Sequence, residues 1–328
     1  MRVFITGADG LLGNNLVREC LYRKFEVRVL LVNETTEAKG LRDLPIDRVY
    51  GNILDPTAVR KGMEGIDVVI HLAASTQVNP PRAKNINDVN IIGTQNIIQS
   101  AKDLKIKRLI HVGTANSFGP GSRENPGNEM SPYSGFKYRL DYFDSKFKAQ
   151  EMVLQAAKNE QLDALVVNPS FMIGPLDSKP SSGALILALV KKKIPVCTPG
   201  SRTYVAVKDA SHAIANAITL GKNGECYILG NESLTYSEFF KLLSKSLQVN
   251  VPKITLPSML IRSYGKFNSS ISKLTGKPPI LSKEMATLSC ENHCYSGEKA
   301  RNELKMPHTP LNIAIKEAFE WFVENGYH

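Results

Sequence analysis

A tyrosine and a lysine four positions apart form the residue pair in this sequence that is best suited to acid–base chemistry. They are Tyr142 and Lys146, and the apolar residues of the surrounding stretch, residues 141–157, have helical spacing. Because residues four apart share one face of a helix, both side chains should point to the same place. The reference pKa of a phenol is about 10, and a lysine ammonium beside it favours the phenolate. The pair therefore predicts proton transfer to or from a substrate oxygen.

A second tyrosine and lysine have the same spacing in a less suitable context. Tyr133 and Lys137 follow Pro132 and enclose Gly135, and neither proline nor glycine favours a helix interior. We therefore favour Tyr142 for the chemistry.

Three glycines near the N-terminus are typical of a phosphate-binding turn. Gly7, Gly10 and Gly13 follow an apolar run at residues 3–5 and open a predicted helix that continues through Leu16. Glycines permit a tight turn and close approach of the backbone to a pyrophosphate, whose charge the free N–H groups of the helix start attract. The segment predicts a dinucleotide site.

The elements that must position these groups alternate along the first half of the chain. Short runs rich in Val and Ile indicate buried parallel strands, and the stretches between them have helical spacing. The predicted strands are at residues 3–5, 27–32, 67–72, 108–112 and 164–167, and predicted helices are at residues 90–104 and 141–157. This alternation predicts an α/β fold with a doubly wound parallel sheet of the Rossmann type.

The alternation decays after Pro175, where proline and glycine interrupt the pattern. Helices are predicted there at residues 184–192, 237–247 and 311–325. We expect residues 1–175 to form the dinucleotide-binding domain with the Tyr/Lys pair. Residues 176–328 should form mainly a smaller, mixed substrate-binding lobe, with some segments returning to the first domain.

Composition and charge argue against other classes of protein. The chain has 328 residues, 42% of them hydrophobic, which is enough for a sizeable core. The formal charge of +10 comes from dispersed Lys and Arg, so nucleic-acid binding is not expected.

No apolar stretch is long enough for a membrane span, and the first strand begins within a few residues of Met1, which favours the cytoplasm. We expect a small-molecule substrate, and the sequence leaves a homodimer open.

Two further segments have both a functional and a structural interpretation. Cys290, His293 and Cys294 could suggest a metal site, but without a second ligand pair we expect none. Residues 256–277 mix apolar side chains with lysines and could touch a membrane surface or an apolar substrate. Core packing of an ordinary lobe is the simpler interpretation of that segment and is our expectation.

The motifs together resemble the extended short-chain dehydrogenase/reductase family, also known as the NAD-dependent epimerase/dehydratase family. The glycine spacing resembles the family's loop, and Tyr142-x-x-Ser145-Lys146-x-x-Ala149 resembles its catalytic signature. Other similar segments, in the family's order, are residues 51–55, 67–74, 90–96, 113–119 and 168–175. Asn168-Pro169-Ser170 and the segment at 177–180 are most similar to the dihydroflavonol-4-reductase-like branch.

This resemblance implies roles for individual residues. Counting back from Gly119 places Thr114 at the position of the catalytic hydroxyl, with Ser117 as a backup, beside Tyr142 as proton donor or acceptor and Lys146 as the group that shifts its pKa. The implied substrate contacts are Thr114, Asn116 and Arg202. The implied cofactor-binding residues are Gly7, Gly10, Leu11, Leu12, Gly13, Val32, Asn33, Asn52, Ile53, Leu72, Ala73, Ala74, Asn90, Val112, Tyr142, Lys146, Pro169 and Met172. His71, within residues 67–74, is expected to be a core histidine.

The end of the second predicted strand leaves the cofactor open between NADP and NAD. In the family an acid there binds a free ribose hydroxyl and an arginine pairs with a 2′-phosphate, but here Leu31 replaces the acid and Val32 the arginine. The similar branch tends to use NADP, which gives a slight preference for it, whereas the missing arginine argues against it. Lys39 or Arg42 could substitute.

The resemblance implies a reductase of a carbonyl, or a dehydrogenase of the alcohol, working by hydride transfer. The alternative is a nucleotide-sugar epimerase that retains its NAD(P), and Arg202 favours it because arginine suits bidentate phosphate pairing. A surface arginine is an equal alternative for that residue. Ala115 and Asn116 stand where a dehydratase has an acid pair, which argues against dehydration. A dinucleotide-binding sensor without catalysis is the third hypothesis.

Overall fold

Seven parallel strands form the central sheet of the computed structural model, which describes residues 1–33, 39–159 and 162–327. Their order is β3-β2-β1-β4-β5-β6-β9, so the chain winds from β1 to one edge and from β4 to the other. The strands are β1 (Arg2–Thr6), β2 (Glu26–Leu31), β3 (Asp47–Tyr50), β4 (Val68–His71), β5 (Arg108–Val112), β6 (Ala164–Pro169) and β9 (Cys226–Leu229). The predicted doubly wound sheet of the Rossmann type is confirmed.

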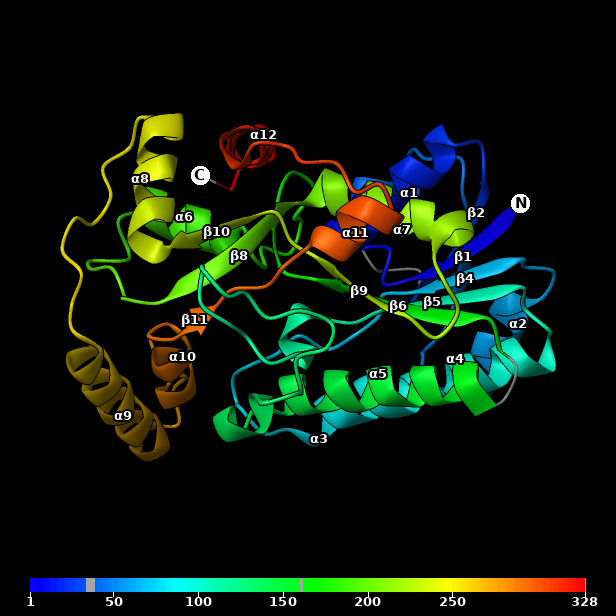
Figure 1. Cartoon of the computed structure of the whole chain (residues 1–328), viewed down its shortest axis with the longest axis horizontal. Helices are drawn as coiled ribbons and strands as arrows, with labels where there is room; N and C mark the ends of the chain where they lie inside the picture. The colour runs from blue at the N-terminus through cyan, green and yellow to red at the C-terminus, as the bar shows by residue number, and fades with distance from the viewer. Residues whose placement is uncertain (34–38, 160–161, 328) are drawn as a thin grey trace.

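Helices cover both faces of this sheet, as Figure 1 shows, because alternate side chains of each strand are buried on opposite sides. In β1, Val3 and Ile5 belong to one hydrophobic core and Phe4 to the other. One face is covered by α1 (Leu11–Tyr22) and α7 (Val207–Leu220), and the other by α2 (Pro56–Met63), α4 (Gly93–Asp103) and α5 (Asp141–Asn159). Short helical segments in the connections are η1 (Lys39–Leu41), α3 (Lys84–Asn87), η2 (Asp88–Ile92), η3 (Ala115–Ser117) and η4 (Gly135–Tyr138).

A smaller sheet forms the centre of a second lobe. β8 (Ser201–Ala206) pairs with antiparallel β10 (Glu232–Thr235) on one side and with parallel β7 (Phe171–Ile173) and β11 (Asn292–His293) on the other. Its core contains Tyr204 and Phe239, whose rings stack with centroids 4.5 Å apart. The remaining helices are α6 (Ala184–Val190), α8 (Tyr236–Leu247), α9 (Ser258–Thr275), α10 (Lys283–Leu288), α11 (Glu298–Glu303) and α12 (Leu311–Glu324).

The two parts interleave along the chain. β7 precedes residue 175 but belongs to the smaller sheet. After residue 175 the chain returns to the central sheet, where α7 packs on one face and β9 adds the last strand. The division into residues 1–175 and 176–328 therefore stays a prediction about folding units.

The expectation of core packing for residues 256–277 is wrong. In α9, Met259 is 79% exposed, Phe267 64% and Leu274 87%, although Ile261 is buried. The reason is that α9 packs mainly against α10, through a face of small and polar residues. Across the described residues, no helix combines the length and apolar character needed to cross a bilayer.

Candidate active site

A cavity of about 860 Å³ lies at the carboxyl ends of the parallel strands, between the central sheet and the smaller lobe. Its walls come from the loop after β1, the ends of β4, β5 and β6, one face of α5, and parts of β8 and α10. All the residues that the sequence assigned to cofactor, substrate or catalysis line this cavity, except Asn33 and Asn90. Their individual roles stay predictions.

The glycine loop after β1 has the shape that a pyrophosphate needs. A Cβ atom on Gly7 would lie 2.7 Å from the backbone nitrogen of Ala73, and one on Gly13 would lie 2.2 Å from the carbonyl oxygen of Gly7. At Gly10 a Cβ meets only that oxygen, at 3.6 Å, so a larger side chain is free to extend toward the cavity. Within the described residues no side chain caps α1, which begins directly after Gly10, so its N–H groups are available to an anion. The loop therefore fits a dinucleotide.

An ion pair lies beside this loop. The Nζ atom of Lys179, in the segment after β7, is 2.7 Å from Oδ2 of Asp9. It balances a carboxylate that would otherwise repel a pyrophosphate. The side chain of Asn15 holds the same segment by donating a hydrogen bond to the carbonyl of Pro175 at 3.0 Å.

Tyr142, Thr114 and Asn116 form a connected polar group on the cavity wall. Burial raises the pKa of Tyr142 above its ordinary value of 10, while the neighbouring Thr114 side chain and the charge of Arg202 oppose that rise. Thr114 Oγ1 also accepts hydrogen bonds from the backbone nitrogen and from Nδ2 of Asn116, both at 3.3 Å. The phenol is thus protonated at neutral pH, and the Thr114 hydroxyl lines the same wall.

Lys146 is held against the sheet rather than against Tyr142. Burial lowers the pKa of its ammonium to about 7, and Nζ donates a hydrogen bond to the carbonyl of Val112 at 2.6 Å. The sequence predicted that Lys146 favours the phenolate. Thr114 and Arg202 are the groups that oppose the rise in the pKa of Tyr142 in this structure, and the role of Lys146 stays a prediction.

Asn90 lies behind the cavity wall and acts on it indirectly. Its side chain accepts a hydrogen bond from the backbone nitrogen of Ser75 at 2.7 Å and donates to the carbonyl of Ser75 at 3.0 Å and to Oγ of Ser145 at 2.9 Å. It therefore ties the loop after β4 to α5, one residue from Lys146. This geometry is that of a positioning residue.

The end of the cavity beside β2 is uncharged within the described residues. Leu30, Val32, Asn52 and Ile53 line it, and Val32 is 66% exposed. Asn33 is exposed and does not line the cavity, nor does the exposed Arg42. The side chain of Lys39 lies outside the described residues.

Arg202 lies on the cavity wall and not on the outer surface. It is half-buried, and its guanidinium carbon lies 5.0 Å from the ring centroid of Phe171 and 6.0 Å from that of Tyr236. Among the described residues no carboxylate pairs with it. An anionic group on a ligand would supply that partner.

Several apolar and aromatic residues of the wall were not found from the sequence. Apart from Phe143 on α5, they come from loops and from the smaller lobe, whose side chains the sequence pattern cannot place. They include Val78, Phe143, Phe171, Met285, Leu288 and Tyr295. The Tyr295 hydroxyl donates to Oδ1 of Asn116 at 3.3 Å and so contacts the polar group of Tyr142, Thr114 and Asn116.

Some other residues considered from the sequence contact neighbouring parts of the protein and do not line the cavity. His71 is buried and bonds Thr6 and Thr94, which confirms it as a core histidine. Ser117 is buried outside the cavity lining. The hydroxyl of Tyr133 donates to Asp144 at 2.7 Å, and Lys137 pairs with Glu291.

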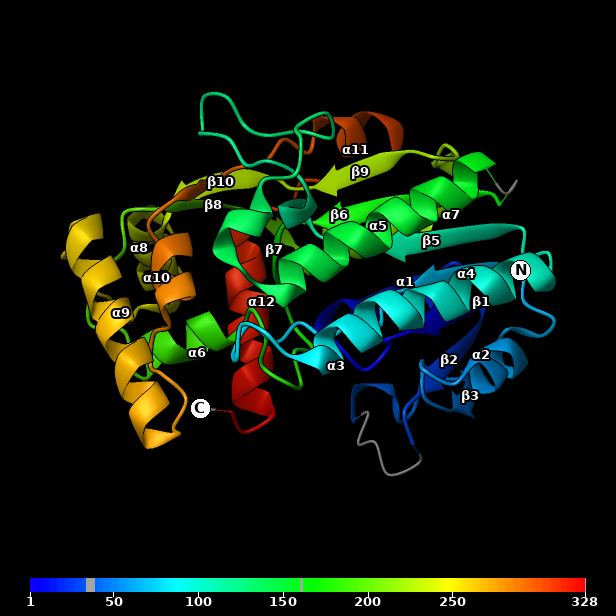
Figure 2. The same ribbon diagram turned by 90° about the horizontal axis from the view of Figure 1, so that it is seen from below.

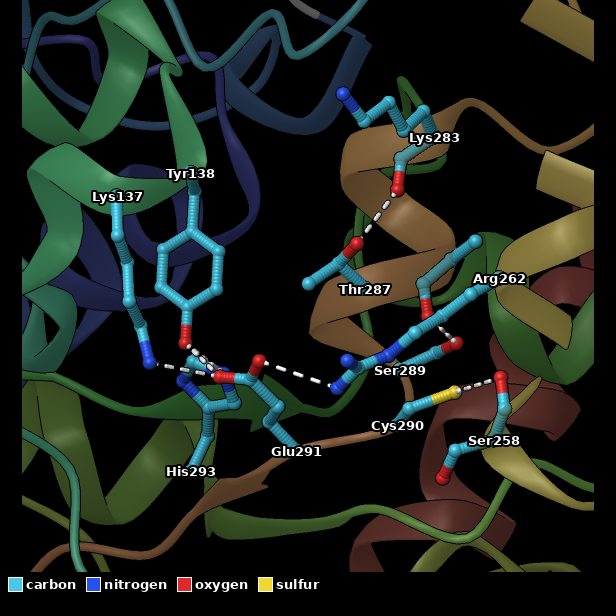
Figure 3. Close-up of polar contacts among 11 residues, drawn as sticks. Lys137, Tyr138, Ser258, Arg262, Lys283, Thr287, Ser289, Cys290, Glu291 and His293 are labelled. Atoms are coloured by element: carbon cyan, nitrogen blue, oxygen red, sulfur yellow. Dashed lines mark hydrogen bonds and ion pairs between the residues drawn. The ribbon is translucent and has the colours of Figure 1, made fainter. Parts of the chain in front are cut away.

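The cysteines and histidine near residue 290 point to separate partners. In Figure 3, Cys290 faces Ser258 while His293 lies beside Tyr138. Cys294 contacts Ser201. Over the described part of the chain, no group of three or more His, Cys, Asp or Glu is placed to hold a metal ion.

Comparisons with known proteins agree with this geometry. The model of the NAD-dependent epimerase/dehydratase family matches residues 3–230. A putative dihydroflavonol 4-reductase of Synechocystis sp. is 29% identical, with 99% of this chain and 95% of that protein covered. Sterol demethylase protein B of Methylococcus capsulatus is 26% identical, with 99% of each chain covered.

A solved structure shows the same fold. The crystal structure of a nucleoside-diphosphate-sugar epimerase from Pseudomonas aeruginosa superposes with a TM-score of 0.82 at 21% identity, covering 100% of this chain and 99% of that one. With a glycine loop shaped for a dinucleotide, a Tyr/Lys helix at the same cavity and a family match over most of the chain, this protein belongs to the NAD-dependent epimerase/dehydratase family and is an NAD(P)-dependent enzyme.

Proposed function

We propose that the chain is an NAD(P)-dependent oxidoreductase that reduces a carbonyl, or oxidises the corresponding alcohol, by hydride transfer. The observation that carries the proposal is the polar group at the cavity wall, in which Asn116 holds Thr114, and Thr114 lies close enough to Tyr142 to oppose the rise in its pKa. Bound NAD(P) supplies the hydride chemistry. The chain's own residues orient the substrate oxygen and move one proton at the Tyr142 hydroxyl.

The pKa of Tyr142 favours the reductive direction. Because burial keeps the phenol protonated at neutral pH, it can give its proton to the oxygen of a carbonyl as that oxygen gains negative charge. Thr114 would donate a second hydrogen bond to the same oxygen. Ala115 and Asn116 offer no acid to protonate a leaving group, which argues against dehydration.

The cavity wall around this group favours a substrate with an apolar body and one acidic group. Phe143, Phe171, Met285 and Leu288 supply apolar contact, and Arg202 supplies a cation without a partner among the described residues. The names of the two relatives, a putative dihydroflavonol 4-reductase and sterol demethylase protein B, are consistent with a ring-bearing apolar substrate.

The second candidate is a nucleotide-sugar epimerase with a retained cofactor, and Arg202 is the specific observation that favours it. A guanidinium at this wall could pair with the substrate diphosphate. The apolar side chains of Phe171, Met285 and Leu288 in the same cavity offer no hydrogen-bond partners to the hydroxyls of a sugar, which places this function second.

Cofactor turnover separates the two functions. A reductase exchanges its cofactor at every turnover, so we expect net NADPH or NADH consumption with apolar aldehydes or ketones, including ones with a carboxylate. An epimerase would bind UDP-sugars tightly without net consumption, and Arg202→Ala would then cost roughly 1.5–3 kcal/mol of UDP-sugar binding. Tight UDP-sugar binding that collapses in Arg202→Ala, with no consumption of cofactor, would reverse our order of the two.

The choice between NADP and NAD is also a proposal. We take NADP, from the similarity to dihydroflavonol-4-reductase-like proteins. The uncharged cavity end at Val32 implies that the preference is small.

A further inference from the structure

Helix α9 exposes a row of apolar side chains, whereas a surface helix in water usually exposes polar ones. Its exposed face carries Leu260, Tyr264, Phe267, Ile271 and Leu274, spaced four and three residues apart, so they form one stripe along the helix. An 18-residue helix is about 27 Å long. A stripe of this length with no described element over it is unusual for a surface that faces only water.

The opposite face of α9, which contacts α10, consists mainly of small and polar residues. At Gly265 a Cβ would lie 2.4 Å from Cβ of Ala286, so the two helices approach closely. Ser269 accepts a hydrogen bond from the backbone nitrogen of Lys283 at 2.9 Å. The outward direction of the apolar stripe is therefore fixed by the packing of α9 on α10.

The charged residues of α9 and of the sequence on either side of it are all positive. No Asp or Glu stands between Glu238 and Glu284, an interval that contains eight Lys and Arg. Among them, Lys266, Lys273 and Lys277 are exposed on α9 or directly after it. An apolar stripe flanked by these three lysines, which form no ion pair among the described residues, complements a surface that is apolar inside and negatively charged outside.

The position of α9 connects it to the cavity. Figures 1 and 2 both place α9 at the outer end of the smaller lobe, with α10 beside it. Met285 and Leu288 of α10 line the cavity, so one short helix separates the exposed stripe from the substrate wall.

Glu291 links α9 to the segment that precedes the helix of Tyr142. Its carboxylate accepts a hydrogen bond from Lys137 at 2.8 Å and from Tyr138 at 2.6 Å, both on η4, and lies 3.4 Å from the guanidinium of Arg262 on α9 (Figure 3). η4 leads into α5, the helix of Tyr142. A surface bound by α9 would therefore be held at a fixed place relative to the cavity.

We propose that α9 binds the surface of an anionic lipid bilayer, with its apolar stripe in the headgroup region and its lysines on the lipid phosphates. The helix lies on the bilayer and does not span it. This inference goes beyond the proposed function and does not depend on it. A second copy of this chain is a less suitable occupant, because pairing two such regions would bring like charges together.

Vesicle sedimentation tests the proposal with purified full-length protein and no substrate. We expect the wild type to sediment with vesicles of phosphatidylcholine and about one third phosphatidylglycerol, far less with phosphatidylcholine alone, and less as salt is added. Leu274→Ser should lower the partition coefficient roughly tenfold through lost apolar burial. Lys273→Gln with Lys277→Gln should lower it about fivefold for each lysine.

Matched control variants lie elsewhere on the surface. Met130 is 88% exposed, against 87% for Leu274, so Met130→Ser removes a similar apolar side chain from another place. Lys61→Gln with Lys158→Gln removes two exposed lysines from α2 and α5. These controls should partition like the wild type. All variants should keep the wild-type melting temperature and turnover of a water-soluble carbonyl, because none of the changed residues lines the cavity.

Three results would overturn the proposal. One is a wild type that stays in the supernatant with anionic vesicles, and another is a partition that Leu274→Ser leaves unchanged. The third is a wild-type dimer in analytical ultracentrifugation that Leu274→Ser converts to monomer, with no vesicle binding, which would make α9 an interface between copies. Since vesicle binding is measured without substrate or cofactor, its failure is distinct from failure of the proposed reaction.

Discussion

Lys146 on α5 donates a hydrogen bond from Nζ to the carbonyl oxygen of Val112 at 2.6 Å, joining the catalytic helix to the end of β5 two residues before Thr114. The lysine is 3% exposed, and burial lowers its pKa from 10.5 to about 7. The neutral amine therefore fits this position better than the ammonium.

This contact predicts a pH dependence of stability. Between pH 7 and 10.5 the unfolded chain keeps the proton on Lys146 while the folded chain has released it, so the free energy of unfolding rises with pH across that window. The expected slope from this residue is about 1.4 kcal/mol per pH unit. Urea unfolding of the wild type and of Lys146→Met at pH 7, 8 and 9 measures it, because the difference between the two proteins isolates the lysine. A constant difference across these pH values would contradict the assignment.

Replacing Tyr142 by phenylalanine removes the proposed proton donor and leaves the rest of the cavity in place. We expect turnover to fall by about a hundredfold or more, the scale of a lost acid–base group, with dinucleotide affinity nearly unchanged. Steady-state kinetics and cofactor titration give the two quantities. Tyr133→Phe is the control, since its hydroxyl bonds Asp144 away from the cavity, and it should retain wild-type turnover.

Substitutions at Gly10 test whether the backbone of the glycine loop must approach a pyrophosphate, because this position has space for a Cβ atom. A valine there should extend toward the pyrophosphate and weaken NAD and NADP alike, because it blocks approach and does not alter recognition of the ribose. Gly10→Ala is the matched control, since its Cβ has space at 3.6 Å from the nearest described atom, and it should bind more tightly than valine. Fluorescence titration with both cofactors checks the order. Wild-type affinity in Gly10→Val would refute the phosphate-loop assignment.

An arginine at Val32 should create a preference for NADP. Val32 is 66% exposed and lines the cavity, so an arginine there can reach a 2′-phosphate without burying its charge. A hydrogen-bonded charge pair of about 1.5–3 kcal/mol corresponds to roughly ten- to a hundredfold tighter NADP binding. The ratio of NADP to NAD dissociation constants measures it, with Val32→Gln as the uncharged control. An unchanged ratio in Val32→Arg would mean that the ribose lies elsewhere.

In the central sheet the sequence predicted the five inner strands and missed the two edge strands for physical reasons. β4 and β6 are continuous apolar runs and were found. β3 lies at the edge of the sheet, and its Asp47–Tyr50 stretch is exposed or half-buried, so it lacks an apolar run. β9 is four residues long and joins the sheet only through pairing with β6, some sixty residues earlier in the chain.

The site could be predicted where motifs determine the backbone and could not be where side chains meet across lobes. The glycine loop and Tyr142 lie where expected because each sits at the end of a strand or on one helix face. The contact of Lys146 with Val112, and the wall made by Phe171 and Leu288, depend on packing between segments distant in sequence. For α9, hydrophobicity indicated burial, but apolar composition does not specify which neighbour covers it.

The pairing of β9 with β6 in the central sheet has a consequence for truncated forms of the protein. β6 is buried along its whole length, and β9 supplies the hydrogen-bond partners of its outer side. A fragment that ended at residue 175 would leave this apolar strand as an open edge, the kind of edge on which strands of other molecules add. Insolubility of such a fragment would follow from unpaired backbone groups, even with every glycine and the Tyr/Lys helix intact. Truncation at residue 175 therefore removes the strand that seals the sheet together with most of the smaller lobe.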